Sequence, residues 1–236
     1  MSTYVYGITR ASGTKFPAEL TGVGQRPVRA VEESGLAAIV SDAPEELTPK
    51  RRELLAHQTV LGHAGAAQTV LPMRFGSVSD DDGAVSEVLA ERADHFRERL
   101  DALENTVEYN VKATHDEEAV LHRVMADNPA LRAASEANRA AGGGTYDERL
   151  RFGEQVAGAV KEREAEDAHL LREALEPLAN DVSPGPESTG WLANDSFLVD
   201  RDAAQRFVAA LDEFQKAQPH LELRVSGPLP PYSFVG

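Results

Sequence analysis

The chain has 236 residues, of which 39 are Asp or Glu and 24 are Lys or Arg, so its formal net charge is −15. A chain this acidic repels phosphate backbones, and we expect no nucleic-acid partner. The absence of cysteine excludes disulfides, thiol nucleophiles and thiolate metal sites. No apolar run reaches the length of a membrane helix and no targeting segment is recognisable, so we expect a cytoplasmic protein without membrane insertion.

The first part of the chain begins with β patterns. Apolar side chains alternate along residues 3–9, which predicts a strand with Tyr4, Tyr6 and Ile8 on one face. Residues 28–32 and 36–40 then form a predicted hairpin.

Two helical patterns follow, with a short strand between them. Thr48-Pro49 is a typical helix start, and the helix is expected to run to about Gln68. Its predicted apolar face consists of three leucines: Leu47, Leu54 and Leu61. Residues 70–75 are then expected as a strand, and one helix follows residues 80–83. Five residues share the apolar face of that helix: Val85, Leu89, Phe96, Leu100 and Leu103.

A second region opens with alternation over residues 107–112, which predicts a strand with Glu108 on its solvated face. Thr114 and Glu117 have the spacing of a capping box at the start of a helix. Asn128-Pro129 starts another helix, which the three glycines at 142–144 end.

The same capping-box spacing recurs at Thr145 and Glu148, before a long helix to about Leu178. Asn194-Asp195 has the character of a two-residue turn between strands 191–193 and 196–199. A helix over 201–217 and a last strand over 221–225 are predicted after it; three residues of that helix are expected to face the core: Phe207, Leu211 and Phe214.

These elements predict an α+β protein with two domains. Residues 1–104 form an N-terminal α+β domain. Residues 105–236 follow the ferredoxin-like order β-α-β-β-α-β, with a helical insertion at about 116–180 in the first crossover and a proline-rich C-terminal tail.

The sequence shows no convergent set of catalytic or metal-binding residues. Glu118 and His122 are one helical turn apart and lie near His115, but a zinc site needs three or four convergent ligands. His57 and His63 are expected to be surface or partly packed residues. We therefore expect no metal, no cofactor and no enzymatic activity.

Two short strings stand out. Leu71–Val78 reads LPMRFGSV, and its Arg74 is expected in an apolar strand where its guanidinium needs a partner. Gly227–Val235 reads GPLPPYSFV, an extended proline-rich path that we expect to dock back onto the fold. Three of its side chains are expected to be buried: Leu229, Tyr232 and Phe234.

With the opening Tyr4–Ile8 segment and Ser196–Val199, these strings resemble the signature segments of the gas vesicle protein L/F family over essentially the whole chain. The resemblance implies a non-enzymatic accessory protein of gas vesicle formation, located in the cytoplasm and at the gas vesicle. It implies an N-terminal α+β domain and a modified ferredoxin-like domain. The implied partners are the small hydrophobic shell protein and other accessory proteins. An acidic, soluble binder suits a client whose apolar surface would otherwise aggregate.

The expected partner-binding or inter-domain residues are Arg74, Phe75, Tyr232 and Phe234. Two alternatives stay open from the sequence. One is a small-ligand-binding or enzymatic ferredoxin-like protein, which a pocket with convergent polar groups would favour. The other is a scaffold that associates with itself through the helical insertion.

Overall fold

A computed structural model describes residues 1–236 except 12–15, 18, 187–189 and 236. The chain forms two compact units, residues 1–108 with 227–236, and residues 109–226. The C-terminal tail therefore groups with the first unit, whereas the domains predicted from the sequence place it with the second half.

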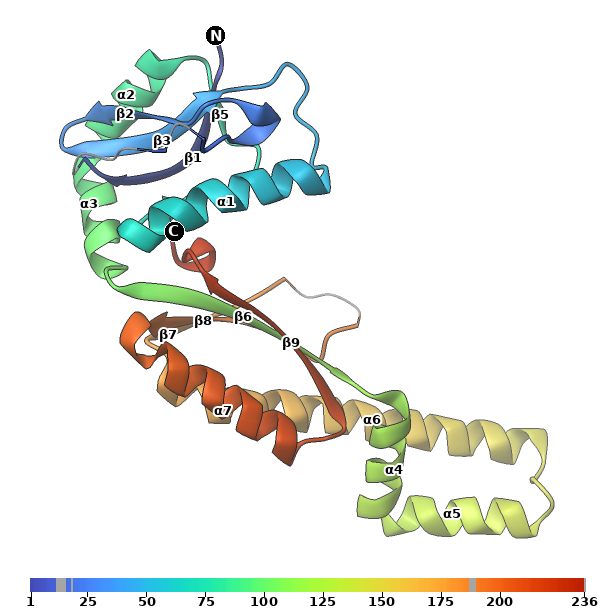
Figure 1. The fold of residues 1–236 in the computed structure, drawn as a ribbon. Helices are drawn as coiled ribbons and strands as arrows, with labels where there is room; N and C mark the ends of the chain where they lie inside the picture. The colour runs from blue at the N-terminus through green and yellow to red at the C-terminus, as the bar shows by residue number, and fades with distance from the viewer. Residues whose placement is uncertain (12–15, 18, 187–189, 236) are drawn as a thin grey trace. The chain divides into compact units, whose positions relative to one another are not determined.

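The first unit is built around a five-stranded sheet with antiparallel pairing (Figure 1). The strand order is β2-β3-β1-β4, and β5 also pairs with β1. The strands are β1 (Thr3–Arg10), β2 (Arg29–Glu33), β3 (Leu36–Asp42), β4 (Leu71–Pro72) and β5 (Val78–Ser79). The predicted hairpin is confirmed, with Glu33 opposite Leu36.

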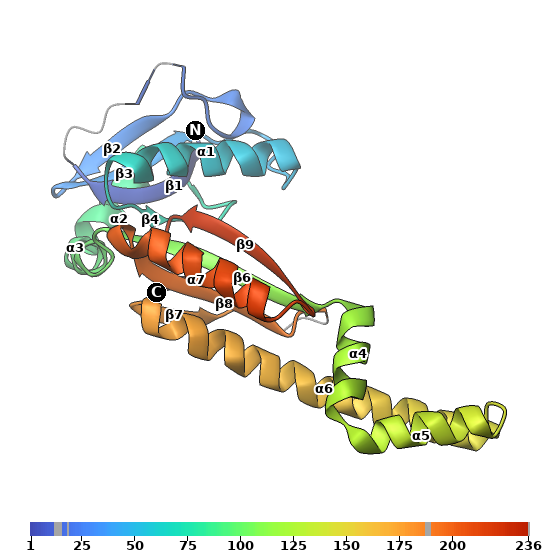
Figure 2. The same cartoon turned by 60° about the horizontal axis from the view of Figure 1, so that its bottom comes forward.

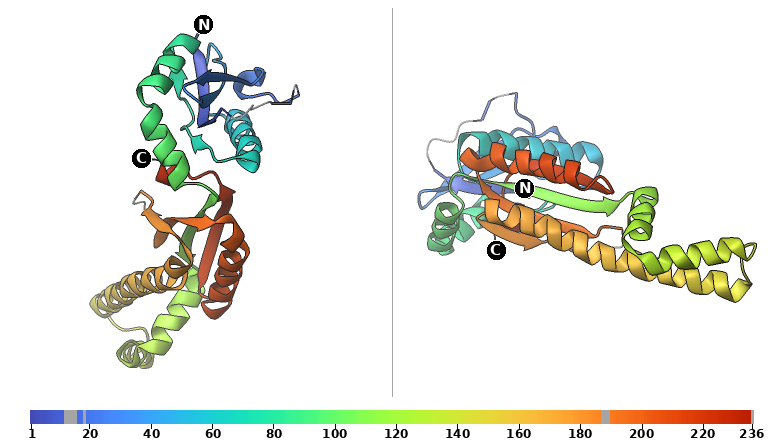
Figure 3. Two further views of the ribbon diagram at one scale, coloured as in Figure 1. Left: turned by 90° about the vertical axis from the view of Figure 1, so that its left-hand side faces the viewer. Right: turned by 90° about the horizontal axis from the view of Figure 1, so that it is seen from below.

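Helices cover both faces of this sheet (Figures 1 and 3). They are α1 (Arg51–Ala67) on one face, and α2 (Asp82–Glu91) and α3 (Ala93–Ala102) on the other. A bulge in β1 between Val5 and Gly7 shifts the alternation of its side chains. Tyr4 and Tyr6 pack in the core beside α1, whereas Ile8 borders the α2–α3 side with Val5. The prediction that all three share one face was therefore wrong for Ile8.

The helices of this unit differ from the prediction in two details. In α1 the buried positions are Glu53, His57, Val60, Leu61 and Ala64. Leu61 is buried and Leu47 packs against the same core from a position before the helix, but Leu54 is 39% exposed, so the predicted leucine face is wrong at Leu54. The helix expected from Asp80 to Leu103 breaks at Arg92 (φ −110°, ψ 20°) into α2 and α3. Its five predicted apolar residues are all buried, so the face was predicted correctly.

The second unit has a four-stranded sheet in the order β7-β8-β6-β9. Its strands are β6 (Thr106–His115), β7 (Asp181–Pro184), β8 (Ala193–Asp200) and β9 (Leu221–Leu229). The ends of β6 and β9, residues 106–108 and 227–229, belong to the first unit. Helices α6 (Tyr146–Leu175) and α7 (Ala204–Ala217) lie on one face of the sheet (Figure 2). The three expected core residues of α7 are buried.

Two further helices, α4 (Glu117–Asp127) and α5 (Pro129–Ala140), pack along the first part of α6 (Figure 2). We call α4, α5 and α6 the helical arm. The capping box at Thr145 and Glu148 is confirmed. The one predicted at Thr114 is wrong, because Thr114 lies in β6 and Asp116 caps α4 instead, accepting a hydrogen bond from the Ala119 N–H at 2.8 Å.

The predicted turn at Asn194-Asp195 is also wrong. Both residues lie inside β8, which pairs with β7 so that Asp181 faces Leu198 and Pro184 faces Asp195. Asp195 tolerates a buried strand position because its carboxylate accepts a hydrogen bond from Arg172 at 2.8 Å.

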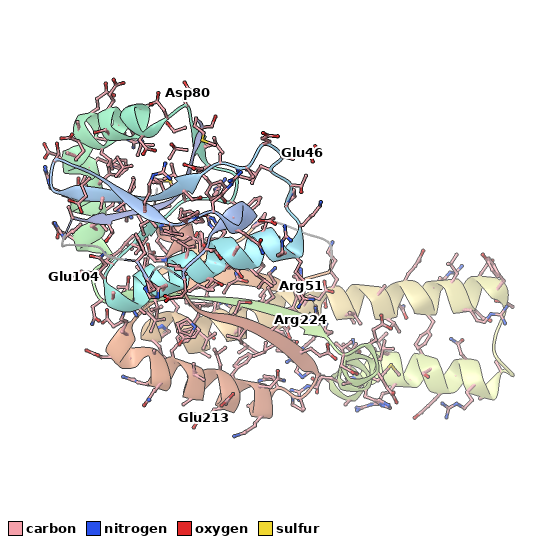
Figure 4. The ribbon with its side chains drawn as sticks, turned by 45° about the horizontal axis from the view of Figure 1, so that its top comes forward. Glu46, Arg51, Asp80, Glu104, Glu213 and Arg224 are labelled. Carbon is pink, nitrogen blue, oxygen red and sulfur yellow. The ribbon has the colours of Figure 1, made fainter. Side chains whose placement is uncertain are left out.

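Charged side chains such as Asp80 and Glu213 extend outward from the surfaces of their own units (Figure 4). Among the described helices, none is both long and apolar enough to cross a membrane.

Candidate functional site

The LPMRFGSV string forms a turn between two very short strands. Only Leu71 and Pro72 pair as β4, and the chain then turns through residues 73–77 before β5; we call residues 73–77 the signature loop. Gly76 has a φ of +95°, a conformation that favours glycine. Arg74 is therefore exposed in a loop, and the prediction of a strand through Phe75 with Arg74 among apolar neighbours was wrong.

Two buried side chains hold both ends of this loop. The Gly76 N–H donates to the Tyr4 hydroxyl oxygen at 3.2 Å, and the Tyr4 O–H donates to Nδ1 of His57 at 2.9 Å. Nε2 of His57 in turn donates to the Met73 carbonyl at 3.1 Å. This chain of donors and acceptors assigns His57 as a neutral imidazole with its proton on Nε2.

Burial keeps both groups of this network uncharged. Desolvation raises the pKa of Tyr4 to about 12. Desolvation also lowers the pKa of His57, although its hydrogen bond to the Met73 carbonyl acts in the opposite direction. His57 is only 3% exposed, so the expectation of a surface or partly packed residue was wrong.

A second network fixes the neighbouring loop against the same core. The Tyr6 hydroxyl oxygen accepts from the Val23 N–H at 2.8 Å and lies 2.9 Å from Oγ of Ser41. A side chain at Gly22 would place its Cβ 1.8 Å from the Tyr6 oxygen, so glycine is required there. On the side that faces the sheet, the signature loop and its neighbour are therefore both held by hydrogen bonds to buried core side chains.

The outer side of the loop is different. Phe75 is half-buried, with its ring 6.0 Å from that of Tyr4 and 5.9 Å from that of His57. Arg74 is exposed, and within the described part of the chain its side chain has no ion pair. The outer side of the loop thus exposes the charged Arg74 next to the half-buried ring of Phe75.

An apolar groove of about 450 Å³ adjoins the signature loop within the first unit; we call it the loop groove. Its walls come from β1, the loop with β5, and the α2–α3 pair. Val78 and Val88 on its rim are 48% and 45% exposed, which is unusual for apolar side chains that border one groove. Arg92, whose guanidinium lies 5.2 Å from the Phe96 ring centre, is the one charged residue among its described lining.

The C-terminal tail docks on the first unit, as expected, but of the three side chains expected to be buried only Phe234 is, whereas Leu229 and Tyr232 are half-buried. Phe234 is 6% exposed, while Tyr232 is half-buried against the core that contains Tyr4. The Ser233 N–H and hydroxyl both donate to the Glu108 carboxylate at 2.8 Å. Burial, with the nearby Glu108 charge, raises the pKa of Tyr232 to about 12.

The tail contacts also explain two other positions. Glu108 is only 3% exposed, so its predicted place on a solvated face was wrong; its carboxylate is held by Ser233, which lies 125 positions away in the sequence. Arg99 donates to the Phe234 carbonyl. A Cβ at Gly65 would lie 3.9 Å from the Pro230 ring, which is ordinary contact. Of the four residues predicted for partner binding or inter-domain contact, only Arg74 is therefore exposed.

The second unit contains a buried charged cluster that the sequence did not indicate. Nε2 of His115 and Nε2 of His220 lie 2.9 and 2.8 Å from Oδ2 of Asp167. Arg163 donates to both oxygens of the same carboxylate, at 2.6 and 3.0 Å. Asp167 is completely buried. We call these four residues the arm cluster.

The arm cluster has ligand types that a metal ion prefers, two imidazoles and one carboxylate. Its geometry is nevertheless that of a closed hydrogen-bond network, because Arg163 already neutralises Asp167 and the imidazole nitrogens lie at hydrogen-bond distance. Burial alone would raise the pKa of Asp167, but the hydrogen bonds from Arg163, His115 and His220 outweigh it and lower the pKa. The cluster ties α6 to β6 and to the residue that precedes β9. Glu118 and His122, considered above, form only an exposed contact at 3.9 Å.

A cavity of about 580 Å³ lies between α6 and the β7–β8 region of the second unit. Trp191, in its lining, has Lys112 and Arg224 each 5.3 Å from its ring centre. Arg172 also lines the cavity, but its guanidinium is already paired with Asp195. The cavity therefore lacks a convergent set of free polar groups among its described residues.

Residues 2–236 match the family model described as gas vesicle synthesis protein GvpL/GvpF. The chain is 64% identical over 237 residues to gas vesicle protein F of Streptomyces sp. (strain CB03234), with all of both chains covered. It is 28% identical over 234 residues to gas vesicle protein L1 of Halobacterium salinarum, covering 91% of this chain and 83% of that protein.

The fold also matches two crystal structures. The gas vesicle protein GvpF from Anabaena sp. PCC7120 superposes with a TM-score of 0.79 at 24% identity, covering 100% of this chain and 98% of that one. GvpF from Microcystis aeruginosa gives 0.75 at 23% identity, with 100% and 99% covered. A mixed α/β fold with two antiparallel sheets is thus shared with both, and the family match over nearly the whole chain shows that the protein belongs to the GvpL/GvpF family of gas vesicle synthesis proteins.

Proposed function

We propose that this gas vesicle accessory protein binds the hydrophobic shell protein through the loop groove and the exposed side of the signature loop. The single observation that carries the proposal is that the loop, held by Tyr4 and His57, borders an apolar groove and exposes Arg74, which forms no ion pair with any residue that the structure describes. Rigid loops that present a free cation beside an apolar groove are typical of binding sites.

The physical demands of the client support the same partner. A protein that forms the wall of a gas space must carry a large apolar surface, which aggregates in water before assembly. A carrier with a net charge of −15 stays soluble while it covers part of that surface. Other accessory proteins of the vesicle are further expected partners, and the helical arm is the region we assign to them.

We infer that the protein is non-enzymatic and acts in the cytoplasm at the gas vesicle. Two buried titratable residues, His57 in the first unit and Asp167 in the second, are engaged in internal hydrogen bonds. A small-ligand role would rely on the cavity beside Trp191, whose Arg172 is already paired. The groove therefore supports a binding module better than the cavity supports an enzyme.

We also propose the domain organisation that this function uses. The strand order β7-β8-β6-β9, with α6 and α7 on one face, is the arrangement of a ferredoxin-like domain whose first crossover has been expanded by α4 and α5. In that organisation the N-terminal α+β domain carries the partner site, and the proline-rich tail docks on it through Ser233 and Phe234.

The experiment is a co-expression pull-down with the major shell protein of the same host. We expect the wild-type protein to retain soluble shell protein and Arg74→Ala to retain less. Arg51→Ala, which removes an exposed arginine at the start of α1, is the matched control. If the folded wild-type protein retains no shell protein, shell-protein binding is wrong; equal retention by Arg74→Ala moves the site away from the loop.

A further inference from the structure

The edge of the first sheet that β4 and β5 form offers the backbone of Val78 to a further strand, because no described strand pairs with β5 on its outer side. Strand β5 pairs with β1, and Tyr4 stands opposite Val78 in that pair. The Val5 N–H donates to the Ser77 carbonyl at 2.9 Å, a bond that flanks the Tyr4–Val78 pair. In an antiparallel ladder, a hydrogen bond at this place means that Tyr4 and Val78 form a non-hydrogen-bonded pair. The N–H and C=O of Val78 therefore point away from β1.

Strand β4, on the same side of β1, directs fewer backbone hydrogen-bonding groups outward. Gly7 stands opposite Pro72, and the Met73 N–H donates to the Tyr6 carbonyl at 2.8 Å. By the same pairing rule Pro72 faces outward with a carbonyl and no N–H. Proline at this position blocks strand pairing there, so along this edge Val78 is where both a donor and an acceptor are presented.

The open position lies directly beside the loop groove. Val78 is part of the groove lining and is 48% exposed, and Val88 across the groove is 45% exposed. A strand added next to β5 would therefore have backbone partners at Val78 and an apolar surface for its alternate side chains.

The charged residues beside the loop groove indicate which kind of segment binds there. Arg92 is the charged group among the described groove residues, and Arg74 is exposed in the adjoining loop. Both are cations, so the groove favours a segment that carries a carboxylate. A second copy of this chain would bring a net charge of −15 against another of −15, which opposes pairing between copies.

We propose that an extended apolar segment of the shell protein adds to β5 as a strand. It exchanges two hydrogen bonds with the N–H and C=O of Val78, places alternate side chains in the loop groove and presents a carboxylate to Arg92. This inference rests on the proposed function and goes beyond it by naming the mode of binding. The alternative mode, a partner helix in the groove, uses the side chains and leaves the Val78 N–H without a partner.

The decisive variant is Val78→Pro. It removes the outward N–H while leaving the Val5–Ser77 hydrogen bond intact and keeping an apolar side chain. Val78→Thr keeps the N–H and almost the same shape, and is the control. In the co-expression pull-down we expect Val78→Pro to retain about fivefold less shell protein, the effect of one hydrogen bond, and Val78→Thr to differ from wild type by less than about twofold.

If circular dichroism shows that Val78→Pro does not fold, amide exchange on the wild-type protein replaces it. The Val78 amide is expected to exchange more slowly in the complex with co-expressed shell protein than in the free protein. A retained shell protein with unchanged Val78 exchange, or equal retention by a folded Val78→Pro, would overturn strand addition and leave the proposed function standing. Failure of the wild-type protein to retain any shell protein would overturn both.

Discussion

The buried histidines of the two units have different structural roles. In the first unit, His57 and Tyr4 hold the inner side of the signature loop and leave Arg74 on its outer side exposed. In the second unit, the arm cluster uses every charge internally: Asp167 accepts from Arg163, His115 and His220. A network that supports a loop with a free cation suits binding, whereas a closed network suits anchoring a helix. This difference supports our proposal that the first unit binds the partner and that the arm cluster holds the helical arm in place.

Asp167→Asn is expected to have the largest effect on stability. It leaves Arg163 without its buried counter-charge and gives the two histidines a poorer acceptor, which typically costs about 3–5 kcal/mol. Urea unfolding followed by the fluorescence of Trp191, the sole tryptophan, measures this change in the second unit. Glu162→Gln, at an exposed position of the same helix, is the control and should leave the midpoint almost unchanged. Equal midpoints for both variants would show that the cluster does not anchor the arm.

Tyr4→Phe tests the other half of the comparison. It removes the hydroxyl between Gly76 and His57 and leaves the buried Nδ1 of His57 without its partner, at a cost of about 1–3 kcal/mol. We expect a lower melting temperature and faster amide exchange in residues 73–77. Tyr146→Phe, at a 72% exposed tyrosine, is the control. A variant that melts earlier without faster exchange in the loop would separate the loop from this network.

Acid should weaken the first network through His57. Its pKa lies below the ordinary value of 6.5 in the folded protein, so the unfolded chain binds the proton more readily. Stability is therefore complete above about pH 6.5 and falls as the pH drops toward the folded-state pKa. We expect wild type to lose more melting temperature than His57→Gln between about pH 7.5 and about pH 5.5. Equal losses would assign the acid sensitivity to other groups.

The sequence indicated the elements whose signals are local. The capping box at Thr145 and Glu148 was predicted because both partners lie in one helical turn. The apolar face of α2 and α3 survived the break at Arg92 because side-chain periodicity does not depend on continuous hydrogen bonding. The docking of the tail followed from its prolines and aromatic side chains, although its partner Glu108 did not.

The elements that were missed depend on contacts far apart in the sequence. His57 reaches Tyr4 across 53 positions, and His220 reaches Asp167 across 53, so neither network leaves a spacing pattern. Strand β7 is four residues long, reads Asp-Val-Ser-Pro without a run of apolar side chains, and is defined by its pairing with β8. Arg74 was placed in a strand from its apolar neighbours, because the turn at Gly76 is specified jointly by Tyr4 and His57.

The most direct test of the loop groove as the partner site compares two exposed valines. Val88→Glu places a carboxylate on the groove rim, and Val208→Glu makes the same change at a 39% exposed valine on α7. In the co-expression pull-down we expect Val88→Glu to lower shell-protein retention at least about tenfold while its melting temperature stays near that of wild type. Val208→Glu should retain the shell protein as wild type does. Full retention by Val88→Glu together with loss in Val208→Glu would contradict the groove and place the partner surface on the second unit.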